Sequence, residues 1–578
     1  MEPGLTGAPR EGPPDDRSGF RAFIDEPAEA DWTAAMPARY PARPVGRPGM
    51  GAFLALAGVI GLAAAVALAF AVPGQRPTAP VVGARASAES EARIFLGAPA
   101  TLDPALHGDN ASSQVIAQVF ETLTAFDPSL TLRPALAESW TIEDGGRRVV
   151  FTLRPDLVFS DGSPLTAADV VRSWLRIIDP DRPSPLASLI LDVEGAEDRL
   201  AGRAGEDAVG LRADGRNVVV EFATPASDFP AIVAGTAFAI APPGFDGAVG
   251  DLSADTFVGS GGYVLSAVAA DGFTLVANER HWAGPPALER IELRFGTGGG
   301  SPVEAFAAGD LDYAPISESD ASWIRYDADL GPLLREVPSL GLEYLGFDTS
   351  RPPFDDVAVR QAFGLAIDWR RIVALATPDG ASVATSMVPP GIPGRSETDF
   401  LPAHDPDRAR QLLAVAGFPG GDGFPPVVYL SNGSAYAEGF LADAARELGV
   451  EVEVRTMDFD PYFERLAVDP PPVFTVGWVA DYPGRNDFLG ILLRTGGTNN
   501  FGRWSSPEFD AAIADSRSAR DESAAAAAFD RAEEIVRRDV PVVPLAYGSS
   551  WALARDGLLG ANQNGMNIIR MAGLAWAE

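Results

Sequence analysis

The hydrophobic and polar positions from residue 427 to residue 476 switch repeatedly between the period of a strand and that of a helix. Val427–Leu430 and Val473–Val476 are short apolar runs, which are typical of buried strands. Val450–Arg455 alternates between apolar and polar positions and predicts a third strand, while Tyr436–Leu448 and Pro461–Leu466 predict helices. This order of strand, helix, strand, helix and strand predicts a parallel sheet.

A group of polar and aromatic side chains follows the last of these strands. The strand is expected to end at a turn at Gly477, and Trp478, Asp481 and Tyr482 come next, before a backbone break at Pro483-Gly484. Ligands of open parallel sheets bind beyond the carboxyl ends of the strands, where these side chains would lie. Spacing alone leaves two interpretations open: a ligand site, or a packed tryptophan beside a turn-forming aspartate.

Helix signals recur along the rest of the chain. Thr166 and Asp169 have the spacing of a capping box, and Asp356 is a candidate N-cap. Asp405-Pro406 begins a further helix, which Gly417 ends. The helix after Asp356 is expected to bury one face, made of Val359, Ala362, Phe363, Ala366 and Ile367.

The N-terminal segment differs from the remainder in composition. Residues 1–47 are rich in Pro, Gly, Ala and charges without periodicity, which predicts disorder. Residues 50–72 carry no charge and are long enough to cross a bilayer core of about 30 Å, and arginines before them favour a cytoplasmic N-terminus. A cleaved signal peptide is the alternative, but its apolar core usually has only about 7–15 residues. We therefore expect a retained transmembrane anchor at 48–72 and a linker at 73–90.

Charge and composition argue against several classes of function. The formal net charge is −34 at pH 7, whereas a nucleic-acid-binding protein needs a basic face. The sequence has no cysteine, which excludes disulfides and thiolate chemistry. The three histidines, His107, His281 and His404, lie far apart and lack metal-ligand spacing. Neither a metal nor a cofactor is expected.

Two glycine-rich stretches, Val258–Tyr263 and Gly296–Gly300, raise the question of a phosphate-binding loop. Neither has the lysine of a P-loop or the spacing of a dinucleotide fingerprint. The sequence also shows no G-x-S-x-G or H-E-x-x-H motif. A hydrolase therefore has no motif to support it, although distant residues could still assemble a site.

Three motifs carry a resemblance to a known family. GWVADYPGRNDFL, at residues 477–489, is similar to the family segment W-x-x-D-Y-P-D-P. FSDGSPLTAADV, at residues 159–170, is similar to F-x-D-G-x-P-x-T-A-x-D-V, and PPFDDVAVRQA, at residues 352–362, to P-P-F-D-D-V-x-V-R-Q-A. From Ala92 onward the chain resembles the family 5 extracytoplasmic solute-binding proteins, which serve ABC importers of oligopeptides, dipeptides, nickel complexes and some oligosaccharides.

The resemblance implies a fold and a division into domains. The fold would be α/β with two lobes, of the periplasmic-binding-protein class that carries an extra inserted domain, here preceded by one transmembrane helix. Lobe I is expected to combine residues 91–126, 251–346 and 544–578, with the small inserted domain at 127–250 and lobe II at 347–543. A ligand would bind in the cleft between the lobes and favour the closed form.

The resemblance also implies which residues bind the ligand. In the oligopeptide binders the aspartate of the W-x-x-D-Y segment pairs with the α-amino group of the peptide, which assigns this role to Asp481. Trp478 and Tyr482 would form walls of the site. Tyr344 and Asn110 are further candidates because of their positions in the family pattern.

Two departures from the family pattern limit what can be transferred. Pro483–Arg485 replaces the P-D-P of the family, so the local loop differs. Thr475 stands where the oligopeptide binders place an arginine near the bound peptide. The preferred length of a peptide therefore cannot be carried over to this chain.

The resemblance thus implies an extracytoplasmic binding protein anchored in the cell membrane by one helix. It would capture a small ligand, an oligopeptide or dipeptide in the first instance, and deliver it to the permease subunits of an ABC importer. It would act as a monomer, without enzymatic activity and without binding nucleic acid. A membrane-tethered ligand sensor on the same scaffold is the alternative that the tail and anchor leave open.

Overall fold

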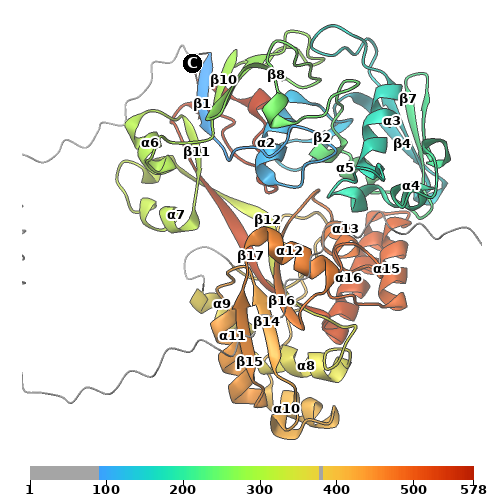
Figure 1. Cartoon of the computed structure of the whole chain (residues 1–578), viewed down its shortest axis with the longest axis vertical. Helices are drawn as coiled ribbons and strands as arrows, with labels where there is room; N and C mark the ends of the chain where they lie inside the picture. The colour runs from blue at the N-terminus through green and yellow to red at the C-terminus, as the bar shows by residue number, and fades with distance from the viewer. Residues whose placement is uncertain (1–89, 377–381, 578) are drawn as a thin grey trace, which may run out of the picture. The chain divides into compact units, whose positions relative to one another are not determined.

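The computed structural model of the chain describes residues 90–376 and 382–577 (Figure 1). The predicted tail at 1–47, the predicted anchor at 48–72 and nearly all of the predicted linker at 73–90 lie outside these residues. No helix within the described part is both long enough and apolar enough to span a bilayer.

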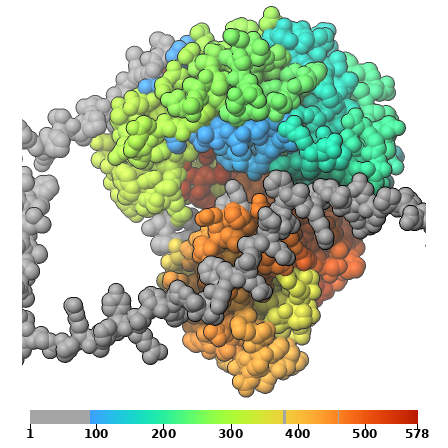
Figure 2. Space-filling model, in the orientation of Figure 1, coloured from blue at the N-terminus to red at the C-terminus, as the bar shows by residue number. Residues whose placement is uncertain are grey.

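One mixed sheet of eleven strands runs through the described residues in the order β15-β14-β16-β12-β17-β11-β1-β10-β9-β8, with β13 beside β17. The long strands β12 (Leu334–Phe347) and β17 (Val542–Ala554) connect its two halves, so both lobes share the sheet (Figure 1). Figure 2 shows the surfaces of the two lobes, with blue-to-green residues forming most of the upper one. The other strands are β1 (Glu91–Phe95), β8 (Tyr263–Ala269), β9 (Gly272–Ala277), β10 (Arg290–Arg294), β11 (Tyr313–Ile316), β13 (Ser382–Val383), β14 (Val427–Ser431), β15 (Val452–Thr456) and β16 (Val473–Val479).

The sheet is parallel only in part, which corrects the sequence-based expectation. Strand β14 pairs in parallel with β15 and β16, as the strand–helix alternation predicts. Strand β16, however, pairs antiparallel with β12 along its whole length, so the sheet is mixed. The predicted end of β16 at Gly477 is also wrong, because Gly477, Trp478 and Val479 continue the pairing opposite Glu343, Leu342 and Gly341.

Helices begin and end where the capping signals indicate. Thr166 and Asp169 form the predicted capping box at the start of α3 (Ala167–Leu175). The Asp356 carboxylate accepts from the backbone N–H of Ala358 at 2.8 Å and caps α8 (Val357–Ala366). Every residue of the predicted apolar face after Asp356 is fully buried. The further helices used below are α2 (Asn110–Val119), α5 (Phe229–Ile232), α10 (Pro406–Val415), α13 (Arg485–Phe488), α15 (Pro507–Arg517) and α16 (Glu522–Asp539).

A second, four-stranded sheet lies within the segment assigned to the inserted domain. Its order is β4 (Ala137–Glu143), β5 (Arg148–Leu153), β7 (Asn217–Glu221) and β6 (Leu211–Asp214), all antiparallel. Trp174 of α3 packs edge-to-face on Phe151, Phe229 and Phe238, with ring centroids 5.6–6.1 Å apart. This aromatic cluster anchors α5, and the loop before α5 carries a residue of the candidate site.

The glycines of Val258–Tyr263 serve backbone packing. A Cβ atom at Gly259 would lie 2.3 Å from the carbonyl oxygen of Val119, and one at Gly261 would lie 2.4 Å from that of Gln118. The end of α2 therefore fits against this turn only because both residues lack a side chain. Close packing accounts for the motif without a phosphate ligand.

Candidate ligand site

Trp478 lies near the end of β16, on a part of the strand that has no parallel neighbour. Strand β14 pairs with β16 only at Val473 and Phe474, so Trp478 extends beyond the parallel strands. It lies opposite Leu342 of β12, and its side chain is partly buried against the core. Its indole Nε1–H donates to Oδ2 of Asp487 at 2.9 Å. Trp478, which the sequence predicted as a site residue, is thus held in place by Asp487, which it did not predict.

Asp487 belongs to α13 and is completely buried. Its Oδ2 atom also accepts from the backbone N–H of Asp481 at 3.3 Å. Its Oδ1 atom has no hydrogen-bond partner among the described residues. A second acidic residue six positions after Asp481, just past the loop that departs from the family pattern, was the available signal.

Asp481 presents a partly buried carboxylate without a cationic partner. Burial alone shifts its ionisation and raises its pKa to about 7, and no arginine or histidine of the described part offsets this. Burial also raises the pKa of Asp487 well above its usual range, and the nearby charge of Asp481 adds to that effect. The structure therefore places two carboxyl groups close together in surroundings that disfavour their charged forms.

The hydroxyl of Tyr482 contacts the inserted segment. It donates to Oδ2 of Asp228, in the loop before α5, at 2.8 Å. The side-chain amide of Asn486 donates to the same Asp228 oxygen at 3.1 Å and to the Tyr482 oxygen at 2.9 Å. Tyr482 is only 1% exposed, so its polar end is already used by this contact.

Arg517, at the end of α15, pairs with two aspartates of the inserted segment. Its Nε donates to Oδ1 of Asp228 at 2.9 Å, and its guanidinium also pairs with Asp192. Arg494 donates to Asp192 at 2.8 Å. Burial opposes ionisation of Asp192, but Arg517 and Arg494 outweigh it and lower the pKa of this carboxyl. These contacts join the inserted segment to lobe II.

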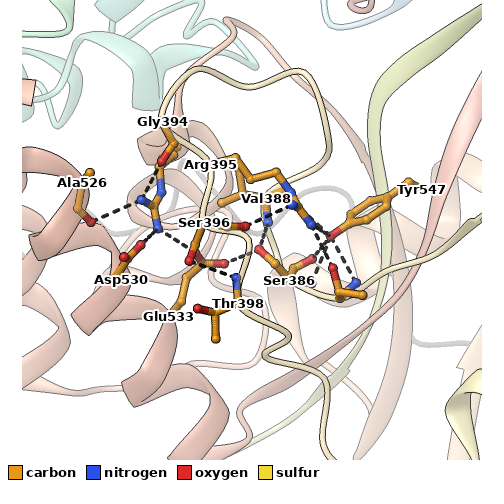
Figure 3. Close-up of polar contacts among 12 residues, drawn as sticks. Ser386, Val388, Gly394, Arg395, Ser396, Thr398, Ala526, Asp530, Glu533 and Tyr547 are labelled. Carbon is orange, nitrogen blue, oxygen red and sulfur yellow. Dashed lines mark hydrogen bonds and ion pairs between the residues drawn. The ribbon is translucent and has the colours of Figure 1, made fainter. Parts of the chain in front are cut away.

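Arg485 fixes α13, and with it Asn486 and Asp487, against the body of lobe II. Its side chain is only 4% exposed and pairs with Asp530 at 2.7 Å and Glu533 at 2.6 Å, both on α16. It also donates to the carbonyl oxygens of Gly394 and Ala526. Figure 3 shows these acceptors together with the neighbouring contacts of Arg395. The arginine that replaces proline in the family pattern is thus part of the support of the site.

The remaining predicted site residues lie apart from this cluster. Tyr344 is in β12 opposite Val476 and is only 2% exposed, within the core. Asn110 is exposed at the first position of α2. No described contact brings either residue to Asp481, and their ligand-binding role stays a prediction. Thr475 is buried, and its hydroxyl lies 2.7 Å from that of Tyr429.

An open pocket of about 490 Å³ lies at the contact between the inserted segment and lobe II. Its walls come from residues 188–198 and 223–224 on one side and residues 490–498 on the other. The Asp192–Arg494 ion pair belongs to its lining, whereas Asp481 and Trp478 do not. The volume lies within the range of about 300–1,000 Å³ that is usual for small-molecule sites.

The sequence profile of the bacterial extracellular solute-binding proteins, family 5 Middle, matches residues 131–500. The chain belongs to this family. Its members are solute-binding proteins, which act outside the cytoplasm and are not enzymes.

Relatives in the family differ in the ligand that they are named for. The chain is 28% identical to the probable deoxycholate-binding periplasmic protein YgiS of Escherichia coli, over 82% of this chain and 90% of that protein. It is 24% identical to the dipeptide-binding protein DppE of Bacillus subtilis, over 83% and 90% of the two chains. The crystal structure of Haemophilus influenzae OppA in complex with the peptide RPPGFSPFR has the same two-lobed fold, with a TM-score of 0.70 at 23% identity, covering 86% of this chain and all of that one.

Proposed function

We propose that this protein captures a small ligand with a cationic group, in the simplest case the α-amino group of an oligopeptide or dipeptide, and presents it to an ABC importer. The observation that carries the proposal is the Asp481 carboxylate, partly buried and without a cation among the described residues to pair with it. An ammonium group of a ligand would supply the missing charge.

The electrostatic argument rests on the cost of an unpaired charge. A carboxylate removed from water loses hydration free energy that only a close cation with good hydrogen-bond geometry returns. Neighbouring carboxylates pair with arginines, as Asp192 does with Arg494 and Arg517. Asp481, in contrast, is left unpaired, which is the arrangement expected of a group whose partner arrives with the ligand.

Closure of the lobes would place the ligand between Asp481 and the inserted segment. The contacts of Tyr482 and Arg517 with Asp228 bring these two surfaces together. The carbonyl oxygen of Asp481 would lie 3.6 Å from a Cβ atom at Gly235, so the two segments meet beside Asp481 itself. Trp478 offers an apolar wall here, and permease subunits would recognise the closed form.

The N-terminal segment extends the proposal to the membrane. We infer that residues 48–72 form a single transmembrane anchor, with residues 1–47 in the cytoplasm and the binding lobes outside. In this arrangement the domains follow the boundaries expected from sequence, and the protein acts as a monomer. A membrane-tethered sensor would use the same anchor and tail, and a partner of the tail would distinguish it from an importer subunit.

A bile acid is the contrasting ligand, because one relative is named for deoxycholate. Deoxycholate is an anion near neutral pH and offers no ammonium group. The two carboxyl groups of the site offer no positive charge that could pair with its carboxylate, so the site favours a cationic ligand over this one.

Thermal unfolding of the full-length protein with a panel of short peptides tests the proposal. A ligand at about 100 times its Kd stabilises a protein by about 2.7 kcal/mol. We expect free peptides to raise Tm, and N-acetylated peptides and deoxycholate to leave it unchanged. A shift with deoxycholate alone, or with none of the peptides, would contradict the proposal and leave the family assignment intact.

A further inference from the structure

We propose that Arg517 and its partners form an ionic latch, which holds the inserted segment against lobe II while the lobes are closed over the ligand and opens when the ligand is released. The latch has four members, two arginines of lobe II and two aspartates of the inserted segment: Arg517, Arg494, Asp192 and Asp228. The inference rests on the proposed function for the identity of the ligand, but the latch can be tested without any ligand.

The strands that connect the two lobes contain a break in their pairing. Within the described residues, the chain passes into lobe II along β12 and returns along β17. The pairing of these strands is irregular between Pro338 and Leu342, where residues 339–341 of β12 face only Gly548 of β17. Extra residues in one strand bend it and interrupt its ladder hydrogen bonds. The two lobes can therefore pivot at this point.

The inserted segment contacts lobe II through non-covalent interactions, because it is continuous in sequence with lobe I at both ends (Figure 1). The Nε atom of Arg517 donates to Oδ1 of Asp228 at 2.9 Å, and its guanidinium pairs with Asp192. The carbonyl oxygen of Arg517 also accepts from the hydroxyl of Ser227 at 2.7 Å. Arg494 adds a second donor to Asp192, at 2.8 Å. A rotation at the break in β12 and β17 would separate these groups together.

The chemistry of the latch suits a contact that forms and breaks. Its two positive and two negative charges balance in the closed form, and water hydrates the same charges when the contact opens. Hydration compensates for much of the lost attraction, so the net stability from such pairs is smaller than their Coulomb energy. The open pocket of about 490 Å³ also admits solvent to the edge of the Asp192–Arg494 pair. Polar contacts of this kind are usual between domains that move relative to each other.

Asp228 connects the latch to the ligand site. Its Oδ1 atom accepts from Arg517 and its Oδ2 atom from Tyr482, which directly follows Asp481 in the chain. Opening of the latch would therefore expose the ligand site at the same time. Because the latch stabilises only the closed form, its loss should raise the rate of ligand dissociation and leave the rate of association nearly unchanged.

Fluorescence energy transfer between two dyes on the ligand-free, full-length protein tests the latch, since the chain has no cysteine of its own. Ala201→Cys in the inserted segment and Ser523→Cys in α16 place one dye on each side, at exposed positions. We expect fewer molecules with high transfer efficiency in Arg517→Met than in the wild type. Arg531→Met should match the wild type, because Arg531 pairs with Asp515 inside lobe II. The same distribution of efficiencies in all three proteins would overturn the proposal.

Arg494→Met keeps the measurement decisive if Arg517→Met does not fold. The Arg494 side chain is 31% exposed, and its loss leaves Asp192 paired with Arg517, so the substitution is milder. We expect the closed population to fall in the same direction and by less. A closed population equal to that of the wild type and of Arg531→Met would overturn the proposal in this case too.

The dissociation rate of a bound peptide, followed by stopped-flow fluorescence, tests whether the latch retains the ligand. Arg494→Met should raise this rate by about fivefold, and Arg531→Met should leave it unchanged. Equal rates for these two variants and the wild type would overturn the role of the latch in retaining the ligand. If none of the peptides binds, the proposed function fails, whereas the energy-transfer measurement still decides on the latch.

Discussion

The hydroxyl of Tyr482 donates a 2.8 Å hydrogen bond to Asp228, a residue 254 positions earlier in the chain. This bond joins the end of the motif W-x-x-D-Y to the loop before α5, on the other side of the site. The tyrosine therefore links two segments that are distant in the chain.

Removing the Tyr482 hydroxyl should weaken the contact with Asp228 without leaving a cavity in the core. Tyr482→Phe leaves the ring in place, but Asp228 loses one donor and Asn486 one acceptor. We expect a loss of about 1 kcal/mol in the free energy of unfolding, measured by chemical denaturation. The same loss in a protein that also carries Asp228→Asn would mean that the bond to Asp228 contributes nothing.

Arg517 should contribute more, because its guanidinium is buried between two carboxylates. Arg517→Met leaves Asp192 and Asp228 without their shared cation, and breaking a buried ion pair typically costs about 3–5 kcal/mol. Arg531→Met is the matched control, since the Arg531–Asp515 pair is exposed and is expected to contribute less than about 1 kcal/mol. Equal stability of the two variants in denaturant would contradict the ionic contact.

Stability should depend on pH in a way set by Asp481. Because burial raises its pKa to about 7, the folded protein keeps a proton between pH 4 and 7 that the unfolded chain loses. The free energy of unfolding therefore falls as pH rises through this window. Asp481→Asn removes the effect, so it should be more stable than wild type at pH 7, by up to about 4 kcal/mol, with the gap closing near pH 4.

Thermal unfolding at several pH values checks this prediction, with Asp515→Asn as an exposed control. The control should follow the wild-type curve throughout. A gap for Asp481→Asn that is constant with pH would show that the substitution acts through packing instead of ionisation.

The two glycine-rich stretches should differ in their sensitivity to a substitution by alanine. In Gly261→Ala the new Cβ would meet backbone atoms of Gln118, Val119 and Phe120 at 2.4–2.7 Å. We expect a loss of about 3 kcal/mol. Gly296→Ala, where no atom lies within 4 Å, should change stability by less than about 0.5 kcal/mol. Unfolding curves that are the same for both would contradict the packing role.

Local signals in the sequence predicted the elements well and their long-range pairing less well. The caps at Thr166 and Asp356 and the buried face of α8 depend on neighbours a few residues away, and these predictions are confirmed. The antiparallel pairing of β16 with β12 joins residues more than 120 positions apart. No periodicity within β16 reports that partner, so its extension through Trp478 was missed.

The residues of the site also divide into those that local sequence predicted and those that depend on long-range contacts. Asp481, Trp478 and Tyr482 are adjacent in sequence and stay together in the structure. Asp487 was missed because its role depends on how α13 folds back toward Trp478. The ion pair between Asp228 and Arg517 joins two segments that are distant in the chain. No spacing rule in the sequence could have predicted it.

The central claim is that Asp481 pairs with the α-amino group of a peptide, and a double-mutant cycle tests it most directly. Affinity would be measured for wild type and Asp481→Asn, each with one peptide in its free and N-acetylated forms. We predict that acetylation weakens binding to the wild type by at least about tenfold, or 1.4 kcal/mol, and has little effect on Asp481→Asn. Equal effects of acetylation on both proteins would contradict the account.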